Sequence, residues 1–250
     1  MTKKIKKYTV TVIVLSYNRP KMLREALASI KDADEVILVD DGSDFDVVAL
    51  AKEFKFRRFS LIGAPPIPIE QRLKKQRLPT LINEALKQAS GDIITYLCDD
   101  DLLGPEWPAT LRGFFMVHGE KYHFVRGHCI RFEYSESGTF EQQTKHLLVF
   151  ADSPRQVITG NFAHLRKCFS KEKIKWHEGI MVGHDTAFFD RVDRVHDTWT
   201  IPLIPAVACY RRIHDKMLTN HVFYNADNSV TIDEFSESAK KLLRDNKFLE

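Results

Sequence analysis

Three consecutive carboxylates are the feature of this sequence that most clearly could do chemistry. Asp99, Asp100 and Asp101 stand where the apolar run at residues 93–97 ends, one residue after it. Carboxylates crowded at the end of a buried strand repel one another unless a hard cation such as Mg²⁺ or Mn²⁺ neutralises them, and such a cation also binds phosphate oxygens. The cluster therefore predicts a site for a metal-bound diphosphate, whereas the alternative interpretation is a solvated acidic turn.

Other polar residues favour the metal site over the solvated turn. A second acidic pair, Asp40 and Asp41, follows another apolar run at residues 35–39. Asp185 lies within an apolar helical pattern, and His214 follows a predicted strand. These positions are the ones at which an α/β protein gathers its functional side chains.

Composition places the chain among ordinary globular proteins. Its 250 residues can form one sizeable core, and 44% hydrophobic and 28% charged residues are near globular averages, so we expect a single domain over residues 1–250. The formal net charge of +3 does not require a nucleic-acid partner. The four cysteines are widely spaced and form no C-x-x-C pair, which argues against a zinc site or a disulfide framework and favours a reduced setting.

No segment of the sequence predicts a membrane span. The apolar run at residues 10–15 is shorter than the core of a signal peptide, and no stretch reaches the roughly 20 apolar residues of a spanning helix. We therefore expect a cytoplasmic protein whose membrane contact, if any, is peripheral.

The first half of the chain alternates predicted strands and helices. Strands are predicted at residues 10–15, 35–39, 58–62 and 92–97, and helices from Pro20 onward, at 47–56 and at 81–89, with a proline-rich loop at 65–68. This order predicts an α/β fold: a Rossmann-like, mostly parallel sheet flanked by helices, with ligands at the carboxyl ends of the strands.

The second half has a different pattern and predicts a mixed α+β arrangement. The predicted elements are a helix at 105–117, strands at 122–134 and 139–150, short helices at 160–169 and 182–192, a strand at 201–210 and a C-terminal helix at 232–243.

Three segments together resemble a known family. VIVLSYNRP at residues 12–20, VILVDDGSD at 36–44 and LINEALKQASGDIITYLCDDD at 81–101, in this order, resemble the inverting glycosyltransferase family 2, which has the GT-A fold. Residues 72–101 also resemble a family member of spore-coat polysaccharide synthesis. The specific resemblance covers about residues 9–110, with a weaker one at 160–215. It implies a nucleotide-sugar-binding half at 1–110, an acceptor-side half at 111–220 and a C-terminal helical extension at 221–250.

The resemblance assigns the nucleotide sugar to the first half of the chain. It places Asp41 and Arg72 against the base, where a carboxylate can accept the imide N–H of a pyrimidine. The further residues implied to contact the nucleotide sugar are Leu15, Tyr17 and Asp99. Alternatively, the Asp-Gly-Ser segment is simply a good turn, and Arg72 belongs to a solvated basic face.

The resemblance places a divalent cation, Mn²⁺ or Mg²⁺, at the acidic cluster. Asp100 is the first choice as direct ligand, with Asp101 and His214 as further candidates, and Arg211 and Arg212 are expected to contact the diphosphate. Mg²⁺ usually takes one or two protein carboxylates, so the third acid is expected to act indirectly or to hold the sugar. A solitary histidine is, however, more often structural than a ligand.

The resemblance identifies Asp185 as the general base that deprotonates the acceptor. The alternative is an ordinary first-turn carboxylate favoured by the helix dipole. The chain departs from many relatives at His184, where they carry an acid, and at Ile82, where they carry arginine; we hypothesise that Arg77 compensates for the latter. Trp107 is a candidate for stacking on a sugar, although core packing is the simpler explanation.

The predicted function is a metal-dependent, inverting transfer of a sugar from a nucleoside-diphosphate sugar, with a UDP-sugar expected, to a hydroxyl of a glycan or other biopolymer. A hydroxylated nucleic-acid base is a less favoured acceptor. The first alternative, a nucleotidyltransferase, is disfavoured because residues 16–20 contain no glycine for a phosphate loop. The second is a sugar-nucleotide or nucleic-acid binding protein without catalysis.

Overall fold

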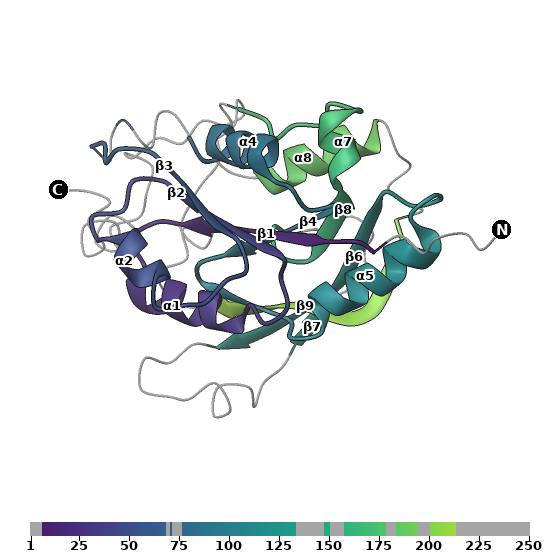
Figure 1. Cartoon of the computed structure of the whole chain (residues 1–250), viewed down its shortest axis with the longest axis horizontal. Coiled ribbons are helices and arrows are strands. Elements are labelled where there is room, and N and C mark those ends of the chain that lie inside the picture. The colour runs from purple at the N-terminus through teal and green to yellow at the C-terminus, as the bar shows by residue number, and fades with distance from the viewer. Residues whose placement is uncertain are drawn as a thin grey trace.

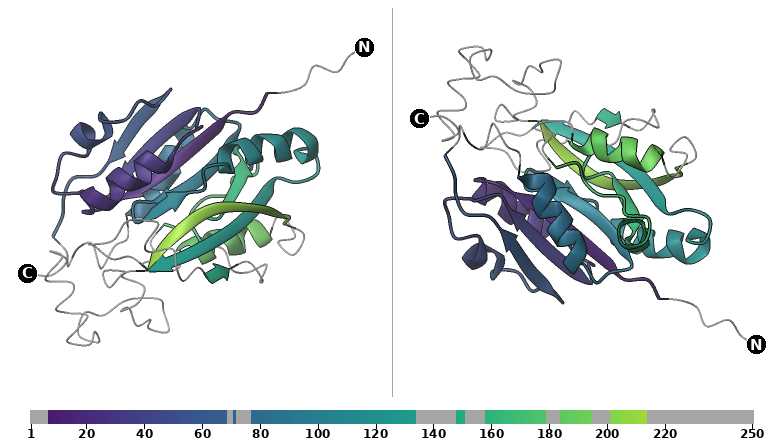
Figure 2. Two further views of the ribbon diagram at one scale, coloured as in Figure 1. Left: turned by 90° about the horizontal axis from the view of Figure 1, so that it is seen from below. Right: turned by 90° about the horizontal axis from the view of Figure 1, so that it is seen from above.

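The protein folds as a sheet with helices on both faces (Figure 1). The computed structural model describes residues 7–68, 71, 77–133, 148–150, 158–178, 184–194 and 201–213. Helices α4, α7 and α8 cover one face of the sheet, and α1, α2 and α5 cover the other, as the views from above and below confirm (Figure 2). Within this part of the chain, no helix has both the length and the apolar character needed to cross a membrane.

The first half of the chain forms the parallel part of the sheet, in the order β3-β2-β1-β4. Its strands are β1 (Val10–Ser16), β2 (Glu35–Asp40), β3 (Phe59–Gly63) and β4 (Ile93–Cys98). Strand β1 is buried along its whole length and pairs in parallel with β2 and β4. A strand covered by helices on both faces must be apolar throughout, which is why this run lacks alternation. The four predicted strands and their parallel arrangement are confirmed, and the structure adds their order in the sheet.

The helices of this half are α1 (Pro20–Ser29), α2 (Val47–Ala51) and α4 (Leu78–Gln88). Proline lies in the first turn of α1 and of α4, where its missing N–H costs no bond. Helix α2 is shorter than the predicted 47–56. Beyond its end, Phe54 stacks on Phe56 and Phe56 on Phe59, each with a centroid separation of 6.0 Å. A turn followed by an irregular segment, with its aromatic rings packed together, takes the place of the second half of the predicted helix.

The second half extends the sheet beyond β4 in the order β8-β6-β9-β5, with β7 beside β6. Its strands are β5 (Asp101–Leu103), β6 (Phe124–Glu133), β7 (Leu148–Phe150), β8 (Phe162–Leu165) and β9 (Leu203–Ile213). Its helices are α5 (Trp107–His118), α7 (Arg166–Ser170) and α8 (His184–Asp193). Parallel and antiparallel pairs mix here, as the predicted α+β character requires.

Two predictions for this half were wrong. Residues 160–169 were predicted as a short helix, but the segment forms β8 followed by the five-residue α7. All four residues of β8 are buried, and a fully buried strand has no period that distinguishes it from a helix. The three-residue strand β5 was not predicted, because its pairing partner β9 lies more than a hundred residues later. The predicted C-terminal helix at 232–243 lies outside the described residues.

A hydrogen-bonded chain of side chains links the two halves in the core. Trp176 Nε1 donates to Tyr96 Oη (3.2 Å), and Tyr96 Oη lies 2.8 Å from His164 Nε2. His164 Nδ1 lies 3.0 Å from the Leu165 carbonyl, so a neutral ring with its proton on Nδ1 satisfies every group in the chain. Burial accordingly lowers the pKa of His164 to about 4.

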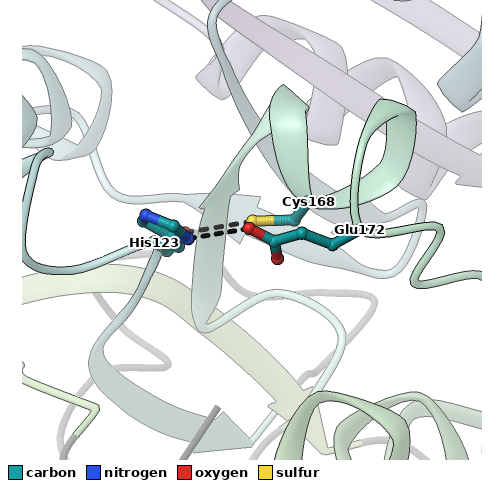
Figure 3. Close-up of side chains that lie close together, drawn as sticks. All are labelled: His123, Cys168 and Glu172. Atoms are coloured by element: carbon teal, nitrogen blue, oxygen red, sulfur yellow. Dashed lines mark hydrogen bonds and ion pairs between the residues drawn. The ribbon is translucent and has the colours of Figure 1, made fainter. Parts of the chain in front are cut away.

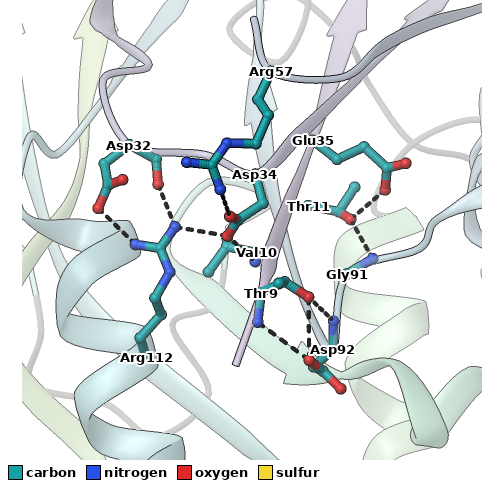
Figure 4. Close-up of polar contacts among 10 residues, drawn as sticks. All are labelled: Thr9, Val10, Thr11, Asp32, Asp34, Glu35, Arg57, Gly91, Asp92 and Arg112. Carbon is teal, nitrogen blue, oxygen red and sulfur yellow. Dashed lines mark hydrogen bonds and ion pairs between the residues drawn. The ribbon is translucent and has the colours of Figure 1, made fainter. Parts of the chain in front are cut away.

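Polar side chains close the amino ends of the parallel strands (Figure 4). Arg112 donates to Asp32 and Asp34, and Asp34 also accepts the backbone N–H of Val10. Gly91 begins the turn into β4, and a Cβ at this position would lie 2.5 Å from Thr11 Oγ1. These groups bond to one another, whereas Asp41 and the three acids at 99–101 lie at the opposite, carboxyl edge of the strands.

We expect a pH-dependent difference in stability between the wild type and a His164→Gln variant. In the unfolded chain His164 binds a proton near its ordinary pKa of 6.5, whereas in the folded chain it does so only near pH 4. The contribution of this site to the free energy of unfolding therefore falls as the pH drops from about 6.5 to about 4. The loss reaches about 3 kcal/mol, at about 1.4 kcal/mol per pKa unit. Urea unfolding at several pH values measures it, and groups common to both proteins cancel. A difference independent of pH would contradict the assignment.

Candidate active site

The three consecutive carboxylates lie between the end of β4 and the start of β5, and they differ in accessibility. Asp99 is 2% exposed; its backbone N–H donates to the Leu15 carbonyl, and its carboxylate accepts the backbone N–H of Tyr17 (both 2.8 Å). Asp101 is also buried, and its carboxylate accepts the backbone N–H of Arg212 (3.2 Å). The Asp100 side chain is 16% exposed. The middle acid is therefore the one that a ligand can reach most directly.

Arg19 forms ion pairs with this cluster. Its Nη1 lies 2.8 Å from Asp99 Oδ1 and 3.3 Å from Asp100 Oδ2, so one guanidinium bridges two of the three acids. We did not assign this residue from the sequence. The available signal was its position in the segment VIVLSYNRP, where it is the only charged side chain.

The local environment opposes full ionisation of the cluster. Burial raises the pKa of Asp99 to about 6, in spite of Arg19, and the neighbouring Asp100 adds to the rise. Burial and the charge of Asp100 raise the pKa of Asp101 well above its ordinary value, although Arg211 opposes the shift. Among the described residues, Arg19 and Arg211 thus offset the effect of burial only in part, and a divalent cation would favour the ionised form of the acids.

The donor atoms at this position fit a divalent cation. One ligand atom each from Cys98, Asp100 and Asp101 lies within 4.8 Å of the others. Carboxylate oxygens suit Mg²⁺ and Mn²⁺, and the partial exposure of Asp100 leaves room for water or phosphate oxygens. The residues present thus fit the predicted metal, with Cys98 as a neighbour that the sequence did not single out.

Strand alternation separates the two arginines predicted to bind the diphosphate. Arg211 lies opposite Asp101 in the antiparallel β5–β9 pair, and its charge lowers the pKa of that acid. Arg212 is buried, and its Nη2 donates to Glu25 Oε2 on α1 (2.5 Å). Successive side chains of a strand point to opposite faces, so only Arg211 lies on the side of the acid. The diphosphate contact of Arg212 stays a prediction.

The loop after β1 and the turn after β2 are held together by side chains. Asp40 accepts the backbone N–H of Gly42 and Ser43 and the Ser43 hydroxyl, which closes the turn. The Asn18 backbone N–H donates to Ser43 Oγ (2.9 Å), and Asn18 Oδ1 accepts the backbone N–H of Asp44 (2.7 Å). Asn18 has φ 49° and Gly42 φ 85°, left-handed conformations that asparagine and glycine tolerate best. The two segments therefore form one rigid rim beside the acids.

Arg77 holds Asp41 in place. From the sequence we considered Arg77 only as a substitute for the arginine that many relatives carry where this chain has Ile82. Arg77 Nε lies 3.0 Å from Asp41 Oδ1, Arg77 Nη2 donates to the Asp41 carbonyl (2.8 Å), and Arg77 Nη1 donates to the Pro65 carbonyl (2.8 Å). One guanidinium thus fixes both the turn after β2 and the loop after β3. Arg77 is a positioning residue for the carboxylate expected to face the base.

Asp185 lies in the first turn of α8 and is half-buried. Phe188, on the same helix, stacks on Trp176 with a centroid separation of 4.6 Å and an interplanar angle of 14°. Asn83 holds the backbone of Trp176 through both of its amide atoms (2.9 and 3.1 Å). The start of α8 is therefore anchored to α4 and the core, a role for Asn83 and Trp176 that the sequence pattern did not reveal.

The remaining predicted residues are placed only in part. Arg72 and His214 lie outside the described residues, so their roles stay predictions. Trp107 is fully buried, and its Nε1 donates to Thr95 Oγ1 (3.1 Å). Core packing explains this tryptophan, and stacking on a sugar is ruled out by its burial.

Comparison with known proteins identifies the family. The profile of Glycosyl transferase family 2 matches residues 11–167, which is more than half of the chain. The chain belongs to this family. Protein CgeD of Bacillus subtilis (strain 168) is 36% identical over 101 residues, which are 39% of this chain and 24% of that protein. The chain thus spans about a quarter of the curated relative that it matches.

Solved structures confirm the GT-A fold. S. aureus TarS matches with a TM-score of 0.59 and 16% identity, over 82% of this chain and 37% of TarS. TarS 1-349 in complex with UDP-GlcNAc matches with a TM-score of 0.58 and 15% identity, over 88% of this chain and 63% of that chain. A third match is glucosyl-3-phosphoglycerate synthase from Mycobacterium tuberculosis in complex with Mn²⁺, UDP and glucosyl-3-phosphoglycerate. Its TM-score is 0.54 and its identity 18%, over 83% of this chain and 73% of the synthase. At these identities, the likeness concerns the fold alone.

We expect Arg77→Lys to destabilise the protein by about 2 kcal/mol. Lysine keeps the charge, but its single nitrogen cannot reach all three acceptors that the separate guanidinium nitrogens contact, so the buried Asp41 loses part of its bonding. Urea unfolding measures the change. The control is Arg24→Lys, which alters an exposed pair with Glu53 and should leave stability unchanged. Equal effects of the two substitutions would contradict the anchoring role of Arg77.

Proposed function

We propose that this protein is a metal-dependent, inverting glycosyltransferase that takes a sugar from a UDP-sugar. One observation carries the proposal: buried Asp99 and Asp101 flank the more open Asp100 at the carboxyl edge of a GT-A sheet, and burial raises the pKa of both buried acids in spite of Arg19 and Arg211. Membership of Glycosyl transferase family 2 and the UDP-containing complexes of TarS and the synthase support it.

The nucleotide would lie along the rim formed by the first two loops. Asp41 would accept the imide N–H of uracil, with Arg77 holding the carboxylate in place, and Arg72 would face the same base. Leu15 and Tyr17 would line the donor site, because both are fixed by bonds to Asp99. Asp99 itself would lie near the ribose. Hydrogen bonds already hold Asp41, Tyr17 and Asp99 in place, which would lower the entropic cost of binding the donor.

Asp100 and Asp101, with His214 as a further candidate, would hold Mn²⁺ or Mg²⁺. When bound, this cation supplies positive charge that stabilises the departing diphosphate. Arg211 would add to the same effect from β9, since it already lies opposite Asp101. Arg19 would keep Asp99 and Asp100 at a fixed separation through its two short contacts.

Asp185 would act as the general base in a direct displacement. Its carboxylate would take the proton of the acceptor hydroxyl while that oxygen forms a bond to the anomeric carbon and the bond to the diphosphate oxygen breaks. A single displacement of this kind inverts the configuration at the anomeric carbon. Phe188 and Trp176 would keep the base in position by fixing α8.

The acceptor would be a hydroxyl of a glycan or other biopolymer, bound by the second half of the chain. A hydroxylated nucleic-acid base remains a less favoured acceptor, because the formal net charge is only +3. We also propose a cytoplasmic location, in agreement with the four free cysteines of the described residues.

A thermal-shift comparison tests the donor and the metal. UDP together with Mn²⁺ should raise the unfolding midpoint more than GDP, ADP or either component alone, because a ligand that binds only the folded state stabilises it. Asp100→Asn should abolish the part of the shift that requires Mn²⁺ and keep the fold. A shift that is the same for all nucleotides, or that persists in full in the variant, would contradict this assignment.

Turnover tests the base. Asp185→Asn should lower kcat for sugar transfer, or for hydrolysis of the UDP-sugar, by about 10²–10⁴-fold, the usual contribution of a general base. Asp190→Asn, on the same helix but more than one turn away, is the control and should keep most of the activity. Release of UDP at the wild-type rate by Asp185→Asn would show that another group takes the proton. An inactive wild type that binds UDP and Mn²⁺ would instead indicate a binding protein.

A further inference from the structure

Three potential metal ligands of different chemistry meet far from the acidic cluster: His123, Cys168 and Glu172 (Figure 3). His123 directly precedes β6, Cys168 lies in α7, and Glu172 follows the end of α7. Their side chains converge although the histidine is separated from the other two by more than forty residues of sequence.

This cluster lies at the opposite edge of the sheet from the candidate active site. The His123 carbonyl accepts the backbone N–H of Leu165 (2.9 Å), and Leu165 pairs with Ile93, the first residue of β4. The three acids expected to act on the donor follow the last residue of β4. The length of a central strand therefore separates the two groups, so this cluster is not part of the donor site.

The geometry of the cluster is close to that of a metal site. One ligand atom from each of the three residues lies within 4.8 Å of the others. His123 Nδ1 is 2.9 Å from Glu172 Oε1, and Cys168 Sγ is 3.8 Å from the His123 carbonyl. Ligands around a tetrahedral cation with bonds of about 2.0–2.3 Å are separated by roughly 3.3–3.8 Å. Small side-chain rotations would bring the three atoms to these separations.

We propose that His123, Cys168 and Glu172 form a Zn²⁺ site. A thiolate, an imidazole and a carboxylate are together the donor set of zinc, whereas Mg²⁺ and Mn²⁺ prefer oxygen ligands alone. The Cys168 side chain is 1% exposed, but those of His123 and Glu172 are each 21% exposed, so a water molecule can complete the tetrahedron from the solvent side. The sequence argued against zinc only because these ligands form no local motif.

The competing interpretations explain less of the cluster. A cluster held only by hydrogen bonds also engages all three residues, because His123 pairs with Glu172 and the Cys168 thiol donates to the His123 carbonyl, but it does not require the side chains of a thiol, an imidazole and a carboxylate to converge. A reactive cysteine is disfavoured because burial and the neighbouring Glu172 raise the pKa of the Cys168 thiol. A bound cation accounts for all three residues and would attach the start of β6 to α7. It would thereby fix β8, which carries His164 of the buried hydrogen-bonded chain.

Cobalt substitution of the full-length protein tests the proposal. Co²⁺ bound to a thiolate gives a sulfur-to-metal charge-transfer absorption, so titration of the wild type should produce this band at one equivalent, and Zn²⁺ should remove it by competition. Cys168→Ser should abolish the band. Cys98→Ser, which alters the cysteine beside the acidic cluster, is the matched control and should keep it.

Two further variants keep the test decisive if Cys168→Ser does not fold, as judged by circular dichroism. His123→Asn and Glu172→Gln should each weaken Co²⁺ binding by at least about tenfold, since even the loss of groups that only support metal ligands has effects of this size. The proposal is overturned by a wild type without the charge-transfer band, by a band that persists in Cys168→Ser, or by unchanged affinity in both His123→Asn and Glu172→Gln. None of these readouts depends on glycosyl transfer.

Discussion

Negative charge that is kept out of water at the end of β4 is the constraint on which the rest of the structure depends. Asp99 and Asp101 are buried, and their raised pKa values show that nearby guanidinium groups compensate them only in part. Such an arrangement costs folding free energy, so it persists only where the surrounding fold is stable enough to hold it. The parallel strands β1, β2 and β4 provide that stability through a core that is almost wholly apolar.

The loops around the acids are rigid because each is bonded to its neighbour. Tyr17 is tied to Asp99, Asn18 to the turn after β2, and that turn to the loop after β3 through Arg77. Loops that carry functional residues are usually mobile, but these bonds hold the loops around the acids in fixed positions relative to the sheet. The same principle extends to the second half, where Asn83 and Trp176 fix the helix that carries Asp185.

The parallel half of the fold could be located from the sequence. Its strands are short continuous apolar runs bounded by turn residues, and its helices have one apolar face and so a clear period. Sequence reasoning failed where tertiary contacts choose between local alternatives. Buried residues 162–165 became a strand through pairing with β4 and β6, and Phe54 and Phe56 packed on a neighbouring ring instead of continuing α2. In the site, the acids could be found from the sequence, but Arg19 could not, and Arg77 was considered only as a substitute for another residue. The reason is that a single arginine belongs to no periodic pattern or motif from which its partner could be inferred.

The sequence by itself determined the family, the strands of the parallel half and the carboxylates at their ends, because these depend on residue types within short segments. Tertiary structure decided which charges meet: it placed Arg211 beside Asp101 but turned Arg212 toward Glu25, and it brought His123 to Cys168 and Glu172. The physical reason is that hydrophobic patterning is read within one element, whereas electrostatic and ligand contacts depend on distances between elements that only the packed sheet fixes.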